Sequence, residues 1–341
     1  MSDTRAATIE DVARHAGVSR AAVSKVIRNA YGVSPAMRER VNAAIEELDY
    51  RPRIAARAMR GSSFTLGIEL PHIGNPFFTK IVAGATTALQ GTGYQLIIAP
   101  ADENGDEGVR ALGALADRQV DGIIAISPLV STDWLERLGT RMPVVMIGRH
   151  DPSEHYDTVT GDDAEGTSLA MAHLIELGHR RIAHLTRSED VTAPGSGTPH
   201  AIRLEQYVDS MRAAGLEQEI RVARTGMTED AARLDTLALL DEDAPTAIFA
   251  GNDELALGAL RAVGEAGLSP EDVSVVGYDD VDMASHPAIS LTTIDQSGVE
   301  MGERAIRLLM ERIRDGRTEP THFSVTPVLK SRASTRAVRA G

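Results

Sequence analysis

The sequence predicts a small all-α headpiece followed by an α/β core built from two similar lobes. Apolar residues recur at helical spacing between capping residues over about the first 50 positions, whereas short apolar runs alternate with amphipathic segments from Phe64 onward. The charge divides at the same place: residues 1–61 carry a net charge of +4 and the rest of the chain carries −18, within a total of −14. A basic head on an acidic body favours contact with nucleic acid through the head alone.

Length and composition exclude several other classes of protein. The 341 residues suffice for two or three domains with a large core, and the absence of cysteine excludes disulfides, thiolate metal sites and cysteine nucleophiles. No apolar run approaches the roughly 20 residues that a membrane span needs. The N-terminal residues are charged, so we do not expect a signal peptide. We therefore expect a cytoplasmic protein without membrane contact, and nothing in the sequence calls for a cofactor.

Residues 8–29, TIEDVARHAGVSRAAVSKVIRN, predict two short helices joined by a tight turn. Thr8 with Asp11 three residues later forms a capping-box variant, Gly17 ends the first helix, and Ser19 caps the second. One face of the second helix is apolar, formed by Ala22, Val23, Val26 and Ile27.

The other face of this second helix is small, polar and basic. It carries Arg20, Ala21, Ser24, Lys25 and Arg28. Such a face suits the major groove of DNA, where basic side chains donate to guanine and a hydroxyl bonds to a phosphate or a base edge. The alternative is an ordinary helical hairpin whose basic face is solvated.

A third helix should begin at Ser34-Pro35, with serine as N-cap, and cover the first two. The segment RIAARAMR, residues 53–60, is too short for a stable isolated helix, so we expect a solvated basic linker that folds on DNA. The predicted organisation is a helix-turn-helix domain at 1–52, a hinge helix and linker at 53–63, and a core at 64–341.

The core alternates strands and helices, which predicts parallel sheets with helices on both faces. The predicted strands are 65–70, 94–99, 122–126, 144–147, 182–185, 247–250, 273–276, 291–294 and 323–329, and the predicted helices begin near 76, 106 and 132 and span 163–177, 200–214, 253–265 and 298–314. Two comparable halves indicate two lobes with a cleft. Loops that follow the strands should line that cleft, because ligands of such sheets bind beyond the carboxyl ends of the strands.

Eight segments together resemble the lactose-repressor/galactose-repressor family of transcription factors. They are TIEDVARHAGVSRAAVSKVIRN at 8–29, YRPRIAARAMRG at 50–61, NPFF at 75–78, DDAEG at 162–166, LGHRRIAHL at 177–185, GNDELALGAL at 251–260, SVVGYDD at 274–280 and LTTIDQ at 291–296. Each segment alone is a weak signal, but their order and spacing together are highly specific.

The resemblance implies a helix-turn-helix headpiece, a DNA-ordered hinge helix and a two-lobed core like that of periplasmic binding proteins, with three chain crossings between lobes. It further implies a homodimer on a pseudo-palindromic double-stranded operator. Base contacts are then expected from Arg20, Ala21 and Lys25, and phosphate contacts from Thr8, Ser19, Ser24 and Ser34. The other expected DNA contacts are Arg28, Arg53, Ala56 and Met59.

The sequence departs from the family pattern at four positions that bear on the operator. Ala22 stands where threonine is common, Lys25 where arginine is common, and Arg28 where asparagine is common. Lysine offers a point charge in place of a bidentate fork, so the operator should differ from the common family site. Met59 replaces the usual leucine and can still act as an apolar wedge in the minor groove.

Residues after the predicted strands are the expected effector contacts. They are His72, Asn75, Phe77, Phe78, Ser127, Arg149, Asp163, Arg203, Asn252, Asp279 and Gln296. Amides, carboxylates and an arginine facing an aromatic ring suit the hydroxyls and apolar face of a sugar, although a nucleobase is also possible. Asn75 or Asn252 could instead cap a helix, Phe77 could belong to the core, and Gln206 departs from the family pattern around Arg203.

Readings of the chain as an enzyme have less support. His173, His179 and His184 do not share one helical face, so a metal site is not expected, and the sequence has no phosphate-binding loop or nucleophile elbow. The alternative function is a cytoplasmic sugar-handling enzyme or binding protein, which leaves residues 1–61 unexplained.

The sequence thus predicts a repressor whose operator affinity is set by a small molecule, expected to be a sugar, that binds between two lobes. We expect one lobe at 64–161 and 295–325 and the other at 162–292 and 326–341. The dimer interface should use helices 76–89 and 253–265. No leucine heptad follows Val328, which favours a dimer over a tetramer, and the arginine-rich stretch 332–339 should be a solvated tail.

Overall fold

The computed structural model describes residues 7–27, 31–50, 62–101 and 105–338, and the chain divides into two compact units, Met1–Ser63 and Phe64–Gly341. Within the described residues of the first unit, three helices surround a small apolar core: α1 (Ile9–Ala16), α2 (Arg20–Ile27) and α3 (Pro35–Glu47). Val12, Val23 and Val41, one from each helix, are fully buried. The predicted all-α headpiece is confirmed.

The caps predicted for the headpiece are present. The backbone N–H of Asp11 donates to Thr8 Oγ1 over 3.3 Å, and the N–H of Thr8 donates to Asp11 Oδ2 over 2.9 Å, which completes the capping box. Gly17 ends α1 with a φ of 64°, a left-handed conformation that glycine adopts without strain.

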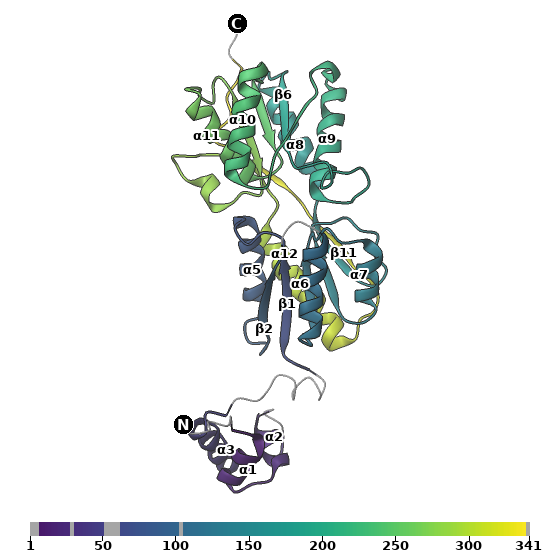
Figure 1. Ribbon diagram of the computed structural model, residues 1–341, viewed down its shortest axis with the longest axis vertical. Coiled ribbons are helices and arrows are strands. Elements are labelled where there is room, and N and C mark those ends of the chain that lie inside the picture. The colour runs from purple at the N-terminus through teal and green to yellow at the C-terminus, as the bar shows by residue number, and fades with distance from the viewer. Residues whose placement is uncertain (1–6, 28–30, 51–61, 102–104, 339–341) are drawn as a thin grey trace. The chain divides into compact units, whose positions relative to one another are not determined.

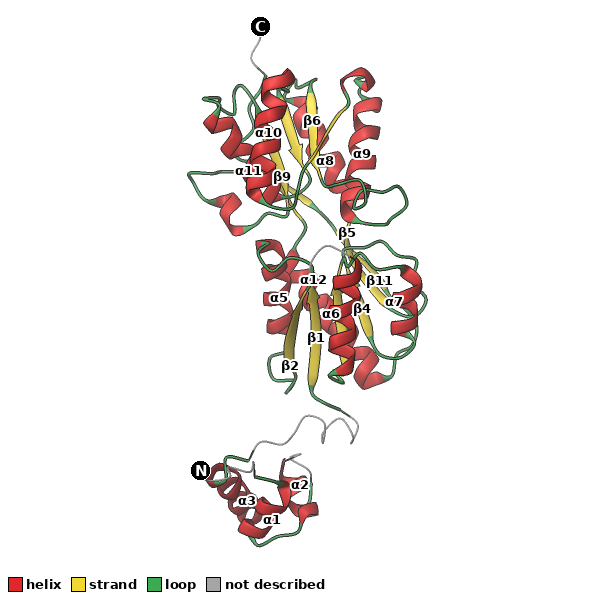
Figure 2. Cartoon of the chain, viewed as in Figure 1, coloured by secondary structure: helices red, strands yellow, loops and turns green. Residues whose placement is uncertain are grey.

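The second unit consists of two lobes, each built on a six-stranded sheet with helices on both faces (Figures 1 and 2). The N-lobe sheet has the order β11-β5-β4-β3-β1-β2, and all its strand pairs are parallel. Its strands are β1 (Thr65–Leu70), β2 (Gln95–Pro100), β3 (Gly122–Ile126), β4 (Val144–Ile147), β5 (Asp157–Gly161) and β11 (His322–Val325). Its helices are α5 (Pro76–Ala88), α6 (Gly105–Asp117), α7 (Thr132–Gly139), α12 (Gly298–Met310) and the short π-helix η3 (Glu311–Asp315).

The C-lobe sheet has the order β12-β10-β9-β8-β6-β7, in which β12 is the antiparallel strand. Its strands are β6 (Ile182–Thr186), β7 (Arg221–Arg224), β8 (Ala247–Ala250), β9 (Ser274–Tyr278), β10 (Thr292–Asp295) and β12 (Val328–Lys330). Its helices are α8 (Asp163–Glu176), α9 (Pro199–Ala213), α10 (Glu229–Asp243) and α11 (Asp253–Glu265), with the 3₁₀ turns η1 (Glu217–Glu219) and η2 (Asp282–Ser285). The two-lobed α/β core predicted from the sequence is therefore confirmed.

The chain passes between the lobes three times, after β5, after β10 and after β11. Central strands such as β1, β3 and β8 are buried along their whole length because helices cover both faces of each sheet. Helices α5 and α12 pack with their backbones in close approach: a Cβ on Gly302 would lie 2.0 Å from the carbonyl oxygen of Ile81. Only glycine fits there.

The core differs from the sequence predictions in one divided strand and in three elements that the patterns did not predict. The predicted strand 323–329 is two strands, β11 and β12, which lie in different lobes because the chain crosses at Thr326-Pro327. The elements β5, β7 and α10 were not predicted. The strand β5, DTVTG, is rich in polar residues, and β7, RVAR, is an edge strand with two arginines, so neither shows a continuous apolar run.

The prediction of a solvated tail is wrong for residues 332–338. Ser334 Oγ donates to the carbonyl of Val275 over 2.6 Å, and Thr335 is hydrogen-bonded to Thr292 over 3.0 Å. Both side chains are buried. The prediction considered only the arginines of this stretch. Ser334 and Thr335, which lie between Arg332 and Arg336, form hydrogen bonds with backbone and side-chain groups of the C-lobe sheet.

Candidate functional site

The headpiece presents the polar face of α2 to solvent. Arg20, Ala21 and Lys25 are exposed, while Val23 and Val26 on the opposite face are buried against α1 and α3. Arg20 Nη1 lies 2.8 Å from Glu10 Oε1, an exposed ion pair that a phosphate or base could displace at small cost. The helix therefore has the exposed basic surface that major-groove reading requires.

The hydroxyl groups predicted to meet phosphates are not equivalent. Ser19 Oγ accepts the N–H of Ala22 over 3.2 Å and Ser34 Oγ accepts that of Met37 over 3.3 Å, so each hydroxyl proton can still be donated to a phosphate. Thr8 differs, because its Oγ1 donates to Asp11 over 2.6 Å and its backbone N–H is also used by Asp11. Ser24 is half-buried on α2. Arg28, Arg53, Ala56 and Met59 lie outside the described residues.

A cavity lies between the two lobes of the core, at the carboxyl ends of strands from both sheets. Its volume is about 100 Å³. Eight of the eleven predicted effector residues line it: Asn75, Phe77, Phe78, Ser127, Arg203, Asn252, Asp279 and Gln296. The first four belong to the N-lobe and Arg203, Asn252 and Asp279 to the C-lobe, with Gln296 on a crossing segment. A ligand here would touch both lobes.

Two asparagines of the cavity also cap helices. Asn75 Oδ1 accepts the N–H of Phe77 at the start of α5 over 2.9 Å, and Asn252 Oδ1 accepts the N–H of Leu255 at the start of α11 over 2.9 Å. The two readings of these residues are therefore compatible. Each cap holds the amide oxygen in place and leaves the amide NH₂ as a donor toward the cavity.

Asp279 is a buried carboxyl group beside the cavity. Gln296 Nε2 donates to its Oδ1, and its backbone has a φ of 125°, which is unusual for a residue other than glycine. Burial raises the pKa of Asp279 well above its ordinary range, against the lowering effect of the Arg203 charge. Burial thus favours the protonated form of Asp279, which can donate to a ligand oxygen, whereas an ionised carboxylate offers only acceptors.

Arg203 is the only lysine or arginine among the described residues that line the cavity. Its Nε lies 2.7 Å from Asp163 Oδ1, its Nη1 donates to the carbonyl of Gly251 over 2.6 Å, and its guanidinium lies 3.6 Å from the centre of the Tyr278 ring. Burial acts to raise the pKa of Asp163, but the Arg203 charge and a hydrogen bond from His150 outweigh it and lower that pKa. Because Asp163 balances Arg203, the cavity suits an uncharged ligand.

Three predicted residues do not line the cavity. Arg149 turns into the N-lobe, where it pairs with Asp151 over 3.0 Å and donates to the carbonyls of Pro128 and Val130. His72 faces Glu254 over 3.7 Å, and Asp163 lies behind Arg203. Gly148, one residue before Arg149, takes the place at the cavity wall.

Sequence reasoning missed the cavity residues of the loop after β6 and of the start of α9. Val191, Thr198, Pro199 and His200 line the cavity. Burial, followed by the charge of Arg203, lowers the pKa of His200 well below its ordinary value, so its imidazole is neutral. Their position in the sequence could have indicated these residues, because they follow the carboxyl end of a strand, as do the residues that were predicted.

The histidines near the α8–β6 junction have separate partners. His173 is bonded to Thr335 over 2.9 Å, His179 to the carbonyl of Arg336 over 3.0 Å, and His184 to the carbonyl of Phe249 over 2.9 Å. In the part of the chain that the structure describes, no group of three His, Cys, Asp or Glu side chains could hold a metal ion. The same described residues contain no helix long and apolar enough to cross a membrane.

Comparison with known proteins finds family matches in both the headpiece and the core. Residues 8–53 match the family described as bacterial regulatory proteins, lacI family, and residues 171–335 match a periplasmic binding protein-like domain. The ribose operon repressor of Escherichia coli K12 is 34% identical over 335 residues, which cover 96% of this chain and 99% of the relative. The chain belongs to the lacI family of bacterial regulatory proteins. The resemblance inferred from the eight sequence segments is thereby confirmed.

Solved structures of this family show the same architecture. The lac repressor dimer bound to operator and the anti-inducer ONPF is 28% identical, with a TM-score of 0.82 over 98% of this chain and 100% of that chain. A LacI family transcriptional regulator from Enterococcus faecium, solved with bound ribose, is 31% identical, with a TM-score of 0.72 over 81% of this chain and 100% of that chain. The protein is therefore a DNA-binding transcriptional regulator and not an enzyme.

Proposed function

We propose that this lacI-family protein is a homodimeric repressor that binds a pseudo-palindromic operator and changes its operator affinity when a small uncharged sugar occupies the cavity between the lobes. DNA contacts are assigned to α2 and the flanking caps, with Arg28, Arg53, Ala56 and Met59 as further contacts from the sequence. The protein would act in the bacterial cytoplasm, where operator DNA lies.

The observation that carries the proposal is the composition of the cavity wall. Side chains from both lobes line one cavity, so a ligand that contacts both binds most tightly to the arrangement of lobes that places them together. An effector can alter operator affinity only by this kind of discrimination between core states.

An uncharged sugar fits the chemistry of the wall. The Phe77 and Phe78 rings, whose centres are 6.1 Å apart, offer an apolar face, and Asn75, Asn252 and Asp279 offer hydrogen-bonding groups. The relative from Enterococcus faecium holds ribose. The small volume favours a monosaccharide, and D-ribose is the first compound to test.

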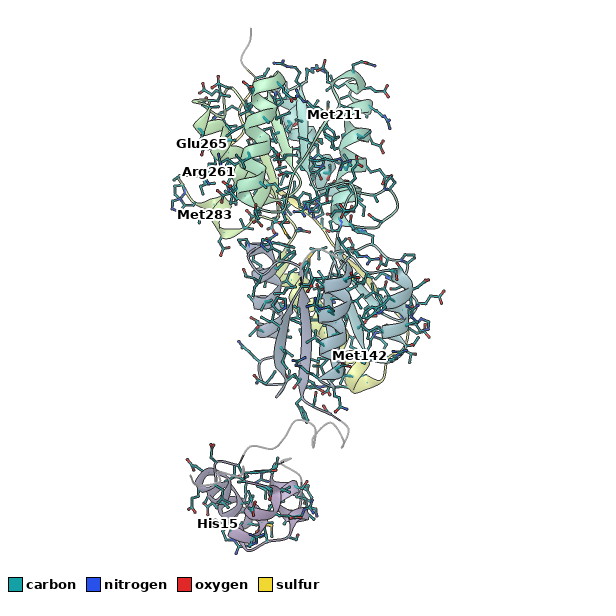
Figure 3. All side chains as sticks on the ribbon, in the orientation of Figure 1. His15, Met142, Met211, Arg261, Glu265 and Met283 are labelled. Atoms are coloured by element: carbon teal, nitrogen blue, oxygen red, sulfur yellow. The ribbon has the colours of Figure 1, made fainter. Side chains whose placement is uncertain are left out.

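The dimer would form along the edge of the core that carries α5 and α11, which lie on the same side of the two lobes (Figure 1). The large apolar side chains exposed in this region include Ile73 before α5 at 62% and Met283 in η2 at 50%. Figure 3 shows Met283 on this edge together with Arg261 of α11. Exposed apolar side chains with charged neighbours are typical of a surface that a second subunit covers.

The proposal is tested by binding to the DNA just upstream of the protein's own gene. The full chain should bind this DNA, and a variant that begins at Phe64 should not, since that variant retains the core unit but lacks the headpiece. Fluorescence anisotropy with a panel of monosaccharides, nucleosides and purine bases then identifies the effector. Equal DNA binding by the two proteins would refute the assignment of DNA binding to the headpiece. A change in operator affinity with purine bases alone would refute the proposal that the effector is a sugar.

The cavity assignment is tested with Asp279→Ala. This variant should weaken effector binding by at least about tenfold, because a buried hydrogen-bonding group is lost, while sugar-free operator binding is kept. The matched control is Asp209→Ala, an exposed carboxylate on α9 outside the cavity, which should leave both properties unchanged. Circular dichroism of both variants verifies folding. A folded Asp279→Ala protein with an unchanged effector response would contradict the assignment.

A further inference from the structure

His150 joins the two lobes at two points, although it does not line the cavity. It follows β4 in the N-lobe, and its backbone N–H donates to the carbonyl of Gly197 in the C-lobe over 2.9 Å. Its side-chain Nε2 lies 2.9 Å from Oδ2 of Asp163, the first residue of α8. Asp163 is only 1% exposed, so the histidine reaches a carboxylate that water scarcely contacts.

The Asp163 carboxylate connects His150 with the cavity. One of its oxygens faces His150, and the other accepts from Arg203 over 2.7 Å. Arg203 lines the cavity and is held from its other side by the Gly251 carbonyl. A displacement of His150 therefore changes the hydrogen bonding of the group that orients Arg203, and a ligand that engages Arg203 acts on the same carboxylate.

The second contact of His150 also leads to the cavity wall. Gly197 has a φ of 68°, and a Cβ at this position would lie 3.4 Å from Asp151 Oδ1, which shows how closely the segment approaches the N-lobe. The next residue, Thr198, lines the cavity and donates to the carbonyl of Val191, a second wall residue, over 2.6 Å. Both anchors of His150 thus hold groups that a ligand would touch.

Two other side-chain contacts between the lobes lack this connection. Lys80 of α5 lies 3.1 Å from Asp282, and His72 lies 3.7 Å from Glu254. None of these four side chains lines the cavity. They can hold the lobes together, but they do not bind a group that contacts the ligand.

We propose that His150 is a positioning residue that couples occupation of the cavity to contact between the lobes, through Asp163 and Arg203. The proposal rests on the function proposed above, in which a small molecule binds in the cavity. His150 and the effector stabilise the same arrangement of lobes, so removal of the His150 side chain must act on operator affinity in the direction opposite to the effector. This sign holds whether the effector weakens or strengthens operator binding.

The experiment compares full-length His150→Ala, His150→Gln and His72→Ala with the unaltered protein, with D-ribose as the probe. His150→Ala keeps the backbone contact to Gly197 and removes only the side-chain contact to Asp163. Titration calorimetry should show about tenfold weaker D-ribose binding, since a hydrogen bond to a charged group is lost from a histidine that is 31% exposed in its side chain. His150→Gln can still donate to Asp163 and should recover most of the affinity. His72→Ala should change it by less than about threefold.

Operator anisotropy without sugar supplies the sign of the coupling. His150→Ala should shift operator affinity opposite to the shift that D-ribose causes, and His150→Gln should restore it. An equal effect of His72→Ala, or a shift in the same direction as D-ribose, would overturn the proposal.

Small-angle X-ray scattering of the sugar-free proteins keeps the test independent of the effector. The full-length His150→Ala protein should have a larger radius of gyration than the unaltered protein, and full-length His150→Gln should not. Unchanged scattering for His150→Ala would overturn the coupling role even if D-ribose is not bound. If the scattering changes and no compound alters operator binding, the function proposed for the cavity fails while the lobe contact stands.

Discussion

Glu69 offers a quantitative test of the electrostatics of the N-lobe. It lies on β1, is fully buried, and accepts a hydrogen bond at Oε2 from the backbone N–H of Ile126 over 3.0 Å, while Oε1 has no hydrogen-bond partner among the residues that the structure describes. Burial raises the pKa of Glu69 from 4.5 to about 8, against the smaller lowering effect of that hydrogen bond. The folded protein therefore keeps a proton on Glu69 at neutral pH that the unfolded chain has lost.

The sign and size of the pH effect follow from this difference. Between the unfolded pKa of 4.5 and the folded pKa of about 8, the folded state binds more protons, so the free energy of unfolding falls as pH rises. At about 1.4 kcal/mol for each unit, Glu69 should reduce the stability of the N-lobe by roughly 3 to 4 kcal/mol between about pH 5 and pH 8. In Glu69→Gln this contribution is absent.

The assay is urea unfolding of the unaltered protein and Glu69→Gln at pH 5 and pH 8, followed by the fluorescence of Trp134, the single tryptophan, which lies on α7 of the N-lobe. The buried amide of Glu69→Gln lowers the free energy of unfolding by the same amount at both pH values, because an amide does not titrate. The difference in stability between pH 5 and pH 8 is therefore unaffected by it. Asp253 and Asp279, whose pKa values burial also raises, contribute equally to both proteins. Glu319→Gln, an exposed position in the same lobe, is the control. Stability curves of the two proteins that run parallel with pH would show that Glu69 does not hold a raised pKa in the folded protein.

Two further predictions concern the packing of the N-lobe. The buried Asp157 carboxylate accepts paired hydrogen bonds from both Arg312 and Arg317 at 2.8 to 2.9 Å, and Arg317 also pairs with Glu311 over 3.0 Å. Asp157→Asn should destabilise the lobe by about 3 to 5 kcal/mol, since the buried Arg312 guanidinium loses its carboxylate partner; urea unfolding measures this, and a loss below about 1 kcal/mol would contradict it. Gly302→Ala should cost at least about 1 to 3 kcal/mol, because its Cβ would collide with the backbone of Ile81 and force α5 and α12 apart. Calorimetry should show a lower melting temperature for the core, and an unchanged value would show that the two helices can move apart freely.

The headpiece shows how far local sequence determines structure. The capping box of Thr8 and Asp11, the left-handed turn at Gly17 and the Ser34 cap all join residues within three or four positions of one another, and each occurs as predicted. Such contacts form from neighbouring groups and depend little on the rest of the chain. The exposed basic face of α2 follows from them, since the caps fix the helix and its apolar side fixes the orientation.

In the core, the sequence predicted the position of strands and which loops approach the cleft. The predicted strands 65–70, 122–126, 144–147 and 247–250 have the observed bounds, because apolar β-branched runs of this length suit only buried strands. The rule that ligand-binding loops follow parallel strands brought eight of the predicted residues to one cavity.

Side-chain direction within those loops depended on distant partners. Arg149 follows a strand as Ser127 does, yet Asp151 and two backbone carbonyls draw its guanidinium into the N-lobe. Asp163 faces Arg203 and His150 instead of the cavity, since the burial of an ion requires that its charge be paired. Sequence position does not specify such pairings, because the partners are brought together only when the lobes fold.

The sequence by itself thus determined the family, the capped helices of the headpiece and the alternation of strands and helices, all of which rest on short-range patterns. Only the tertiary structure decided that 323–329 divides between two sheets, that His200 enters the cavity, and that His150 of one lobe meets a buried carboxylate of the other. These features arise from contacts between segments far apart in the chain, whose geometry is set by the packing of both lobes and not by any local preference.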